Sequence, residues 1–276
     1  NWRSIRIESN GHAELMHTEI RYASKAIDAD SEYATATISG VTLRENNFGI
    51  YVYNPYAEVT AENCLIADNN STGMFIRASS AHTFRNCTIV GNGFGDSGWY
   101  GAGIHVGAAT VNLDNCIVAF NADGLHHAGA DDSQTVIHNS IFYNPDGHNL
   151  IWTAGGDIPQ LDQDGNTVID PLFVDRDAGD YELANGSPGI DAGLGFQASQ
   201  ADLLGNPRYD DPGMPNRGGG YPAYVDIGAF ERQTATISGD LAVMNVSSPT
   251  PLFLSAGEAY SFDWMVANVG SEDIGT

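Results

Sequence analysis

The chain has 276 residues, with 35 Asp and Glu against 11 Lys and Arg, which gives a formal net charge of −24. A nucleic-acid or anionic-membrane partner is not expected, because neutralising phosphate needs clustered Lys and Arg. We predict no membrane insertion, because no run of 18 apolar residues occurs. A hydrophobic content of 42% can form a core, and 32 glycines favour turns over helices. These features predict an all-β protein.

A short sequence block recurs along the first half of the chain. Its copies start at Gly40, Asn63, Asn86, Asn115 and Asn139, so the steps are 23, 23, 29 and 24 residues. The long step holds an insertion near residues 93–101, and a glycine-led strand follows each of the first four copies. A period of this length is typical of a solenoid, and the short alternating segments favour strands over helices. Residues 1–155 are therefore predicted to form a parallel β-helix of about six coils.

Stacked coils place equivalent residues above one another, so the repeat predicts two ladders. The first is an inward stack of small side chains, formed by Cys64, Cys87, Cys116 and Ser140. The three cysteines are predicted to be buried free thiols, because an odd number in single file suits neither a disulfide framework nor a metal site. The second ladder lies at a turn and consists of Asn46, Asn69, Asn92, Asn121 and Asn144, whose amides can hydrogen-bond along the axis.

The period stops after Trp152, and three distinctive segments follow. Residues 187–193 read Ser-Pro-Gly-Ile-Asp-Ala-Gly, residues 202–208 read Asp-Leu-Leu-Gly-Asn-Pro-Arg, and residues 226–231 read Asp-Ile-Gly-Ala-Phe-Glu. This tail resembles the C-terminal end of bacterial secreted right-handed parallel β-helix repeat proteins, in the pectate-lyase-like superfamily. The resemblance covers about residues 1–232 and implies an extracellular or cell-surface location. It does not identify an activity, because the superfamily mixes lyases, hydrolases, epimerases and proteins without a known reaction.

The tail motifs look like a cap, which a solenoid needs because an open end exposes a strand edge. We expect residues 156–232 to form this cap and residues 233–239 to be a linker. Residues 240–276 are similar to the first strands of an immunoglobulin-like adhesion module, but a sandwich of that type needs about 100 residues. The predicted fold is thus a right-handed parallel β-helix solenoid with a C-terminal cap and a partial β-sandwich or strand extension.

Aromatic side chains are expected on one outward face of the solenoid. The position shared by the glycine-led strands holds Tyr51, Phe75, His105 and His126. Trp99 and Tyr100 in the insertion, and Trp152 near the end, could join them. Aromatic rings suit the apolar faces of sugars, so Tyr51, Phe75, Trp99, Tyr100 and Trp152 are predicted to bind carbohydrate. The alternative is that the rings only stabilise the coils by stacking.

Catalysis on a uronate by β-elimination needs a base and a group that neutralises the carboxylate. The candidate bases are His105, His126 and His127, and the candidate neutralising groups are Arg77 and Arg44. His126 and His127 cannot both line one site, because adjacent strand residues face opposite sides.

Hydrolysis would instead need two carboxylates, for which Asp114, Asp123 and Asp131 are candidates. Asp123, Asp131 and Asp132 could also hold a metal ion. No pair of carboxylates has diagnostic spacing, so the sequence favours a non-enzymatic role. If the chain is an enzyme, His105, His126 and Asp123 are the catalytic candidates.

One acidic turn has the alternating oxygen donors of a Ca²⁺ loop. It places Asp162, Asp164 and Asn166 around Gly165, and Asp175, Asp177 and Asp180 form a second acidic turn. Tight turns without metal use the same residue types, so Ca²⁺ is a possible cofactor rather than a required one.

The sequence as a whole favours a binding, adhesive or assembly role toward a polysaccharide or a neighbouring surface protein, including self-association. A polysaccharide lyase or glycoside hydrolase is the first alternative, and a structural filament or surface-layer building block is the second.

Overall fold

The computed structural model describes residues 2–77, 80–95, 101–129, 134–153, 158–233, 241–246 and 264–268. Two compact units divide the chain, residues 1–232 and residues 233–276, and each is described by itself. Within the described ranges, no helix is long and apolar enough to cross a membrane.

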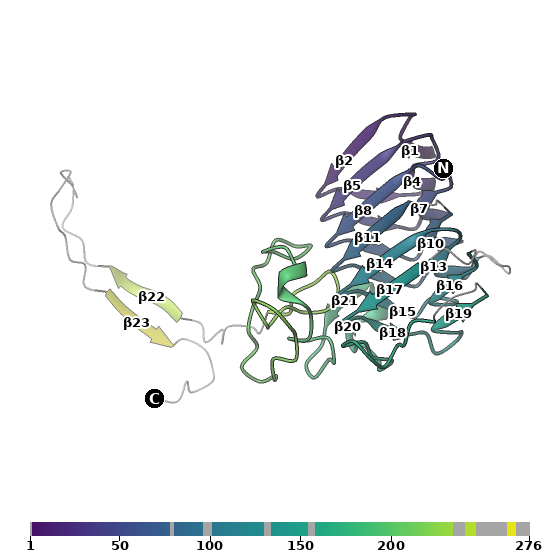
Figure 1. The fold of residues 1–276 in the computed structure, drawn as a ribbon. Coiled ribbons are helices and arrows are strands. Elements are labelled where there is room, and N and C mark those ends of the chain that lie inside the picture. Colours follow the sequence, from purple (N-terminus) through teal and green to yellow (C-terminus); the bar gives the residue numbers. More distant parts are fainter. Residues whose placement is uncertain are drawn as a thin grey trace, which may run out of the picture. The chain divides into compact units, whose positions relative to one another are not determined.

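The first unit contains a solenoid of three parallel sheets (Figure 1). The first sheet holds β1 (Trp2–Arg6), β4 (Ala23–Asp28), β7 (Phe48–Val52), β10 (Thr72–Ile76), β13 (Ala102–Val106), β16 (Leu125–His127) and β19 (Leu150–Trp152). The second holds β2 (His12–Met16), β5 (Thr35–Ser39), β8 (Glu58–Glu62), β11 (Ala81–Arg85), β14 (Thr110–Asp114) and β17 (Gln134–His138). The third holds β3 (Glu19–Arg21), β6 (Thr42–Arg44), β9 (Leu65–Ala67), β12 (Thr88–Val90), β15 (Ile117–Ala119) and β18 (Ile141–Tyr143). Each coil adds one strand to every sheet, so the predicted β-helix of about six coils is confirmed.

The core of the solenoid is built from stacked apolar side chains. In the first sheet, Ile27, Ile50, Met74, Ile104 and Leu125 occupy equivalent positions and are completely buried. One coil cannot shield its inward side chains from water, whereas stacked coils form one continuous core.

The cysteine stack is confirmed. Cys64, Cys87 and Cys116 are free thiols with no exposed surface. Ser140 continues the stack, because its Oγ accepts a hydrogen bond from the Cys116 N–H at 3.0 Å. Burial raises the pKa of Cys64 and Cys87, so these groups stay as neutral thiols.

The asparagine ladder is also confirmed. The backbone N–H groups of Asn46, Asn69 and Asn92 each donate to the side-chain oxygen of the asparagine one coil further on, at 3.0 Å. Asn121 donates in the same way to Asn144, at 2.8 Å. The ladder continues beyond the predicted members, because Asn144 donates to Asn149 Oδ1 at 2.7 Å.

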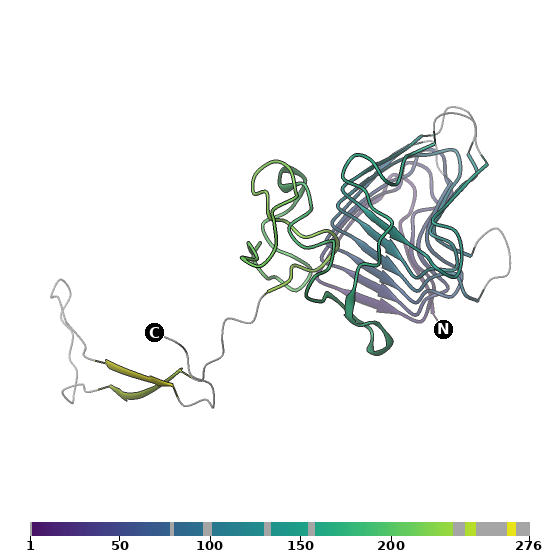
Figure 2. The same cartoon turned by 90° about the horizontal axis from the view of Figure 1, so that it is seen from below.

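The range expected to form the end cap divides into two parts in the structure. Residues 164–167 pair with the free edge of the last coil, since the N–H of Asn139 donates to the Asp164 carbonyl and that of Phe142 donates to the Thr167 carbonyl. Residues 170–232, called the lateral region here, instead pack along the outer face of the third sheet (Figures 1 and 2). This region contains β20 (Phe173–Asp175), β21 (Asp180–Leu183) and the short 3₁₀ helices η1 (Arg176–Ala178) and η2 (Gly195–Gln197).

Apolar contacts hold the lateral region to the third sheet. Ile117 and Ile141 of the coils pack in one cluster with Ile190 and Ile227. A second cluster joins Leu65, Ala67 and Val90 to Tyr181, Ala229 and Phe230. The outward side chains of β9 and β15 are thus covered, which explains why these two strands are apolar on both faces.

A second asparagine series, which the sequence analysis did not assign, links successive coils to the lateral region. Its members are the first residues of the repeated blocks and have positive φ angles, which asparagine tolerates. Their side-chain amides donate to carbonyls of the lateral region: Asn63 to Ala201, Asn86 to Asp226, Asn115 to Leu194 and Asn139 to Ala192, at 2.9, 3.2, 3.1 and 2.7 Å. We call these four residues the corner asparagines.

The distinctive tail segments meet in one buried polar network. Glu231 Oε2 accepts from Arg208 Nη1 at 2.8 Å, and the Glu231 N–H donates to Asp202 Oδ2 at 2.9 Å. Asp226 Oδ1 accepts from the Asp191 N–H at 2.8 Å. Burial, with the nearby Glu231 charge, raises the pKa of Asp226 to about 8. The residues of the three tail segments therefore hydrogen-bond to one another and stabilise the lateral region.

The second unit contains an antiparallel strand pair, β22 (Leu241–Val246) and β23 (Trp264–Asn268). The predicted strand extension is confirmed at this level. The immunoglobulin-like interpretation remains a prediction.

Candidate functional site

The predicted aromatic row forms on the first sheet. Tyr51, Phe75, His105 and His126 are direct neighbours in register along β7, β10, β13 and β16. The rings of Tyr51 and Phe75 stack at 5.0 Å, and those of Phe75 and His105 stack at 4.9 Å. His105 and His126 meet edge to face at 5.1 Å. The alignment of the row is therefore confirmed.

The exposure of the row differs from the expectation. Phe75, His105 and His126 are only 3%, 5% and 7% exposed, so their ring faces do not form an open surface for a polymer. Tyr51 is half-buried, and Lys25 Nζ lies 3.4 Å from the centre of its ring. Position along a strand determines which rings align, but it does not determine how much of each ring water reaches.

The remaining predicted aromatic residues are not part of the described row. Trp152 pairs in register with His127, and their rings lie 4.0 Å apart, whereas Ile151 occupies the position beside His126. The prediction that Trp152 extends the row is therefore wrong. Trp99 and Tyr100 lie outside the described residues, as do Asp131 and Asp132.

Three exposed tyrosines that the sequence analysis missed lie on the connections from the first sheet to the second. Tyr33, Tyr53 and Tyr56 are 51%, 44% and 55% exposed, and we call them the tyrosine patch. Tyr33 and Tyr56 stack at 5.0 Å, and Tyr53 lies nearly parallel to Tyr51, 6.3 Å away. Arg77 Cζ lies 5.3 Å from the Tyr53 ring centre. The signal was available, because Tyr33 and Tyr56 are 23 residues apart, one full repeat.

A basic pocket of about 340 Å³ lies on β1 and β4. Its lining residues are Arg3, Ser4, Arg6, Ser24, Lys25, Asp28 and Asp30. Lys25 connects this pocket to the aromatic row, because its Nζ contacts both the Tyr51 ring and Asp28 Oδ1, the latter at 3.2 Å. Three of the chain's 11 basic residues meet here, and Arg77 places a fourth beside the tyrosine patch. This arrangement can attract a carboxylate or sulfate group.

The predicted catalytic carboxylates and arginines are dispersed, although His105 and His126 are neighbours. Asp123 accepts hydrogen bonds from the backbone N–H and the Nδ1 of His148, at 2.8 and 3.0 Å, a pairing that the sequence analysis missed. Asp114 ends β14 in the second sheet and accepts from His138 Nδ1 at 3.0 Å. Arg44 ends β6 in the third sheet, so of the two candidate arginines only Arg77 lies beside the row.

His127 faces inward, as the alternation along the strand predicts. It is completely buried, and its Nδ1 lies 2.8 Å from Thr135 Oγ1. Burial lowers the pKa of His127 to about 4, so the ring is neutral near pH 7.

The predicted calcium residues line a cavity of about 390 Å³ at the end of the last coil, together with nine other residues. Asn166, however, has a structural role: its Oδ1 accepts from the Ser140 N–H at 3.0 Å and its Nδ2 donates to the Ile137 carbonyl at 2.9 Å. Among the residues that the structure places, no three His, Cys, Asp or Glu side chains form a metal-binding group. Asp162 and Asp164 remain calcium candidates, whereas the Asn166 side chain is used in hydrogen bonds to the backbone of the last coil.

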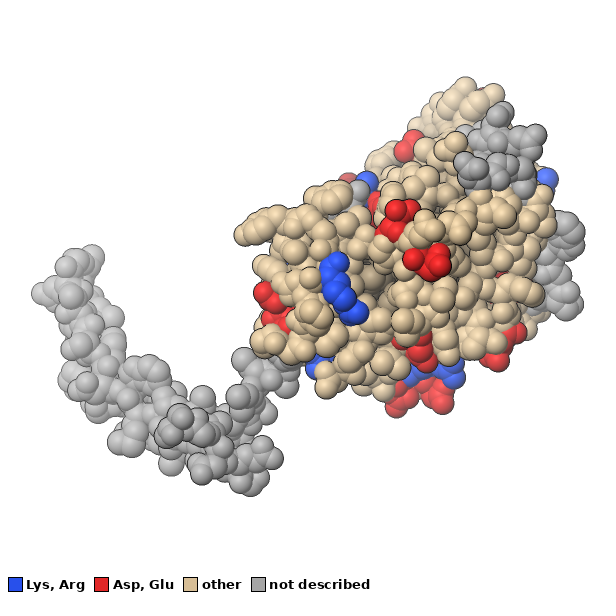
Figure 3. All heavy atoms as spheres, turned by 60° about the horizontal axis from the view of Figure 1, so that its bottom comes forward, with Lys and Arg blue, Asp and Glu red and all other residues tan. Residues whose placement is uncertain are grey.

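The second acidic turn is explained by backbone hydrogen bonds. Asp175 Oδ1 accepts from the Ala178 N–H, and Asp180 Oδ1 accepts from the Glu182 N–H, both at 3.1 Å. Such bonds are the usual reason for aspartate in tight turns. Figure 3 shows one face of the molecule, on which carboxylates form small separate groups.

Comparison with known proteins identifies the family. The family described as "Right handed beta helix region" matches residues 2–168. No curated protein matches the chain. Among solved structures, the crystal structure of pectate lyase Pel9A is similar with a TM-score of 0.44 and 12% sequence identity, covering 83% of this chain and 70% of that chain. Because the family match extends over more than half of the 276 residues and the coils are present, the chain belongs to the right-handed β-helix family.

Proposed function

We propose that this chain is an extracellular or cell-surface glycan-binding protein that holds an acidic polysaccharide along the first sheet. The observation that carries the proposal is the clustering of bases: Arg3, Arg6 and Lys25 line one pocket with Asp28 and Asp30, and Arg77 lies over Tyr53, in a chain with a net charge of −24. In a chain that repels anions overall, a local group of cations beside exposed rings is suited to bind a charged sugar.

The tyrosine patch replaces the buried row as the surface that contacts sugar. Tyr53 and Tyr56 are on the same connection, and Tyr33 stacks on Tyr56 from the preceding coil. An extended polymer that crosses the coils would meet one ring after another, while the basic pocket would bind its acidic groups. The stack formed by half-buried Tyr51 with buried Phe75 and His105 then supports Tyr53.

The test is affinity electrophoresis of the chain with polygalacturonate, alginate and the neutral polymer dextran. We expect retardation by an acidic polymer and not by dextran. Replacing Tyr53 or Lys25, by Ala and Gln respectively, should weaken binding about tenfold, the effect of losing one stacking or charged contact. Tyr221→Ala is the matched control, because Tyr221 is 90% exposed in the lateral region.

Two outcomes would contradict the proposal. Equal retardation by dextran, or unchanged binding by the Tyr53 and Lys25 variants, would exclude an acidic-glycan site at this place. The same mixtures should be followed by ultraviolet absorbance and by reducing-end assay. If the chain forms unsaturated products or new reducing ends, and the His105→Ala variant does not, the chain is a lyase or hydrolase rather than a binding protein.

A further inference from the structure

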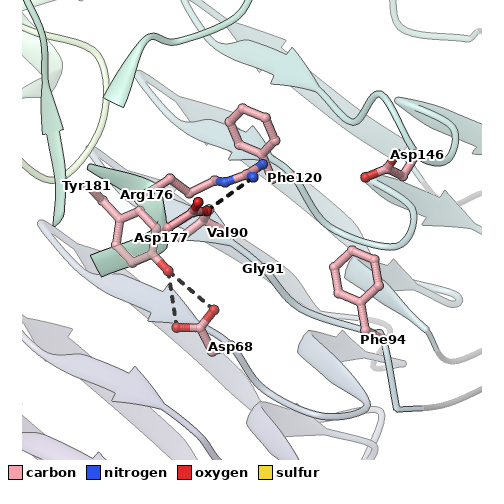
Figure 4. A pocket seen from close by; sticks show the side chains of 9 residues that line it. All are labelled: Asp68, Val90, Gly91, Phe94, Phe120, Asp146, Arg176, Asp177 and Tyr181. Atoms are coloured by element: carbon pink, nitrogen blue, oxygen red, sulfur yellow. Dashed lines mark hydrogen bonds and ion pairs between the residues drawn. The ribbon is translucent and has the colours of Figure 1, made fainter. Parts of the chain in front are cut away.

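A cavity of about 300 Å³ lies where the lateral region meets the third sheet, away from the tyrosine patch (Figure 4). It arises at a turn position that recurs in successive coils, occupied by Glu45, Asp68, Gly91 and Phe120. All four have positive φ angles of 57°, 53°, 68° and 54°. Gly91 has no side chain, and a Cβ added there would lie only 2.4 Å from Asp68 Oδ1. The missing side chain leaves a gap between Asp68 and Phe120.

The lateral region supplies one fixed wall of this cavity. The Tyr181 hydroxyl donates to the Asp68 carboxylate, whose oxygens lie 3.1 and 3.2 Å away. The Arg176 guanidinium lies over the Phe120 ring, 4.4 Å from its centre, and contacts Asp177 at 3.4 Å. Tyr181 is buried in the cluster that joins the lateral region to the coils, so this wall is formed before any ligand binds.

The other wall comes from two turns of the coils. Phe94 is 62% exposed and borders the cavity opposite Tyr181, and Asp146 lies on the turn after β18. The cavity therefore combines an exposed ring, three carboxylates and one guanidinium. It needs both the coils and the lateral region to be complete.

The mixture of charges selects the kind of ligand. An anion would be repelled, because Asp68, Asp146 and Asp177 outnumber Arg176, and an organic cation would compete with the Arg176 guanidinium, which already covers the Phe120 ring. A neutral polyol suits all of them, because each hydroxyl can donate to a carboxylate and accept from the guanidinium. The volume lies at the small end of ligand sites, which suits one ring rather than a chain.

We propose that this cavity binds one neutral pyranose residue, with an apolar face of the sugar on Phe94 and its hydroxyls between Asp68 and Arg176. The site is separate from the first sheet and uses a different sugar chemistry. A glycan that carries both acidic and neutral residues could occupy both places, but each site stands without the other.

The test is saturation-transfer-difference NMR on the full chain with millimolar methyl glycosides of glucose, galactose, mannose, xylose and N-acetylglucosamine. We expect saturation of the C–H protons on one face of at least one glycoside. Phe94→Ala and Arg176→Gln should each lower the affinity about tenfold, because each removes a ring contact or a charged hydrogen bond. Phe196→Ala, which removes a ring 65% exposed in the lateral region, should have no effect.

The outcomes separate this site from the first sheet. Absence of transfer from all five glycosides would overturn the proposal, as would transfer unchanged in both the Phe94 and Arg176 variants. If Tyr53→Ala abolished the signal, the sugar would bind at the tyrosine patch instead. Because Phe94 and Arg176 are solvent-exposed, circular dichroism should show that their variants remain folded.

Discussion

Replacing Asn92 by alanine tests whether the asparagine ladder stabilises the solenoid. Asn92 is fully buried, and its Oδ1 accepts from the backbone N–H and the Nδ2 of Asn69 at 3.0 and 2.9 Å. Its Nδ2 donates to the Ile66 and Val90 carbonyls and to Asn121 Oδ1, at 2.9, 3.0 and 2.9 Å. Alanine would leave the Asn69 N–H buried without its acceptor.

An orphaned buried N–H costs about 1–3 kcal/mol, and each further lost bond costs about 1 kcal/mol net. Asn92→Ala also removes the bond from Asn69 Nδ2 and the bonds of the two Asn92 Nδ2 hydrogens, which share three acceptors, so we expect it to lower the free energy of unfolding by about 4–6 kcal/mol. Urea unfolding followed by far-ultraviolet circular dichroism measures this change. Asn70→Ala is the matched control, because Asn70 is exposed and its side chain makes one bond of 3.3 Å to Asn47. A loss below about 1 kcal/mol for Asn92, or equal losses for both variants, would refute the reasoning.

Three further predictions concern the buried groups. The pKa of Asp226 is raised in the folded chain from 3.8 to about 8, so its stabilising contribution is complete below the lower value and is lost as pH rises to the upper one. The urea midpoint should thus decrease as the pH rises from about 4 to about 8, and Asp226→Asn should flatten this dependence; an equal slope in both proteins would contradict it. The three thiols should react with a thiol reagent only as urea unfolds the chain, and rapid reaction of the folded chain would contradict their burial. Arg208→Ala should cost about 3–5 kcal/mol, because it leaves the Glu231 carboxylate buried without its cation. Limited proteolysis should then cut the lateral region before the coils, and unchanged resistance would count against this role.

The coils could be predicted because the repeat converts sequence position into spatial position. Once residues 23 apart lie on adjacent coils, Cys64 must stack on Cys87 and Asn69 on Asn92 without any knowledge of distant contacts. The alignment of Phe75 with His105, which are 30 residues apart, follows in the same way once the insertion near residues 93–101 is taken into account.

The lateral region could not be placed in this way because its segments have no period. The contact between Asn86 and the Asp226 carbonyl joins residues 140 positions apart, and nothing in the spacing of either segment indicates it. The burial of His105 was also beyond the pattern, because alternation distinguishes inward from outward but does not say what covers the outward side. By contrast, Tyr33 and Tyr56 carried a readable signal in their separation of one repeat.

The corner asparagines have a consequence for how this protein could change length. A solenoid usually grows by duplicating a coil, since each new coil contacts only its two neighbours. Here four donors on successive coils, from Asn63 to Asn139, meet four carbonyls of one irregular chain segment. An extra coil inserted between them would shift the later donors by about 4.8 Å, far more than a hydrogen bond tolerates. The lateral region thus fixes the number of coils between Asn63 and Asn139. Gains or losses of whole repeats should therefore be confined to the coils before Asn63.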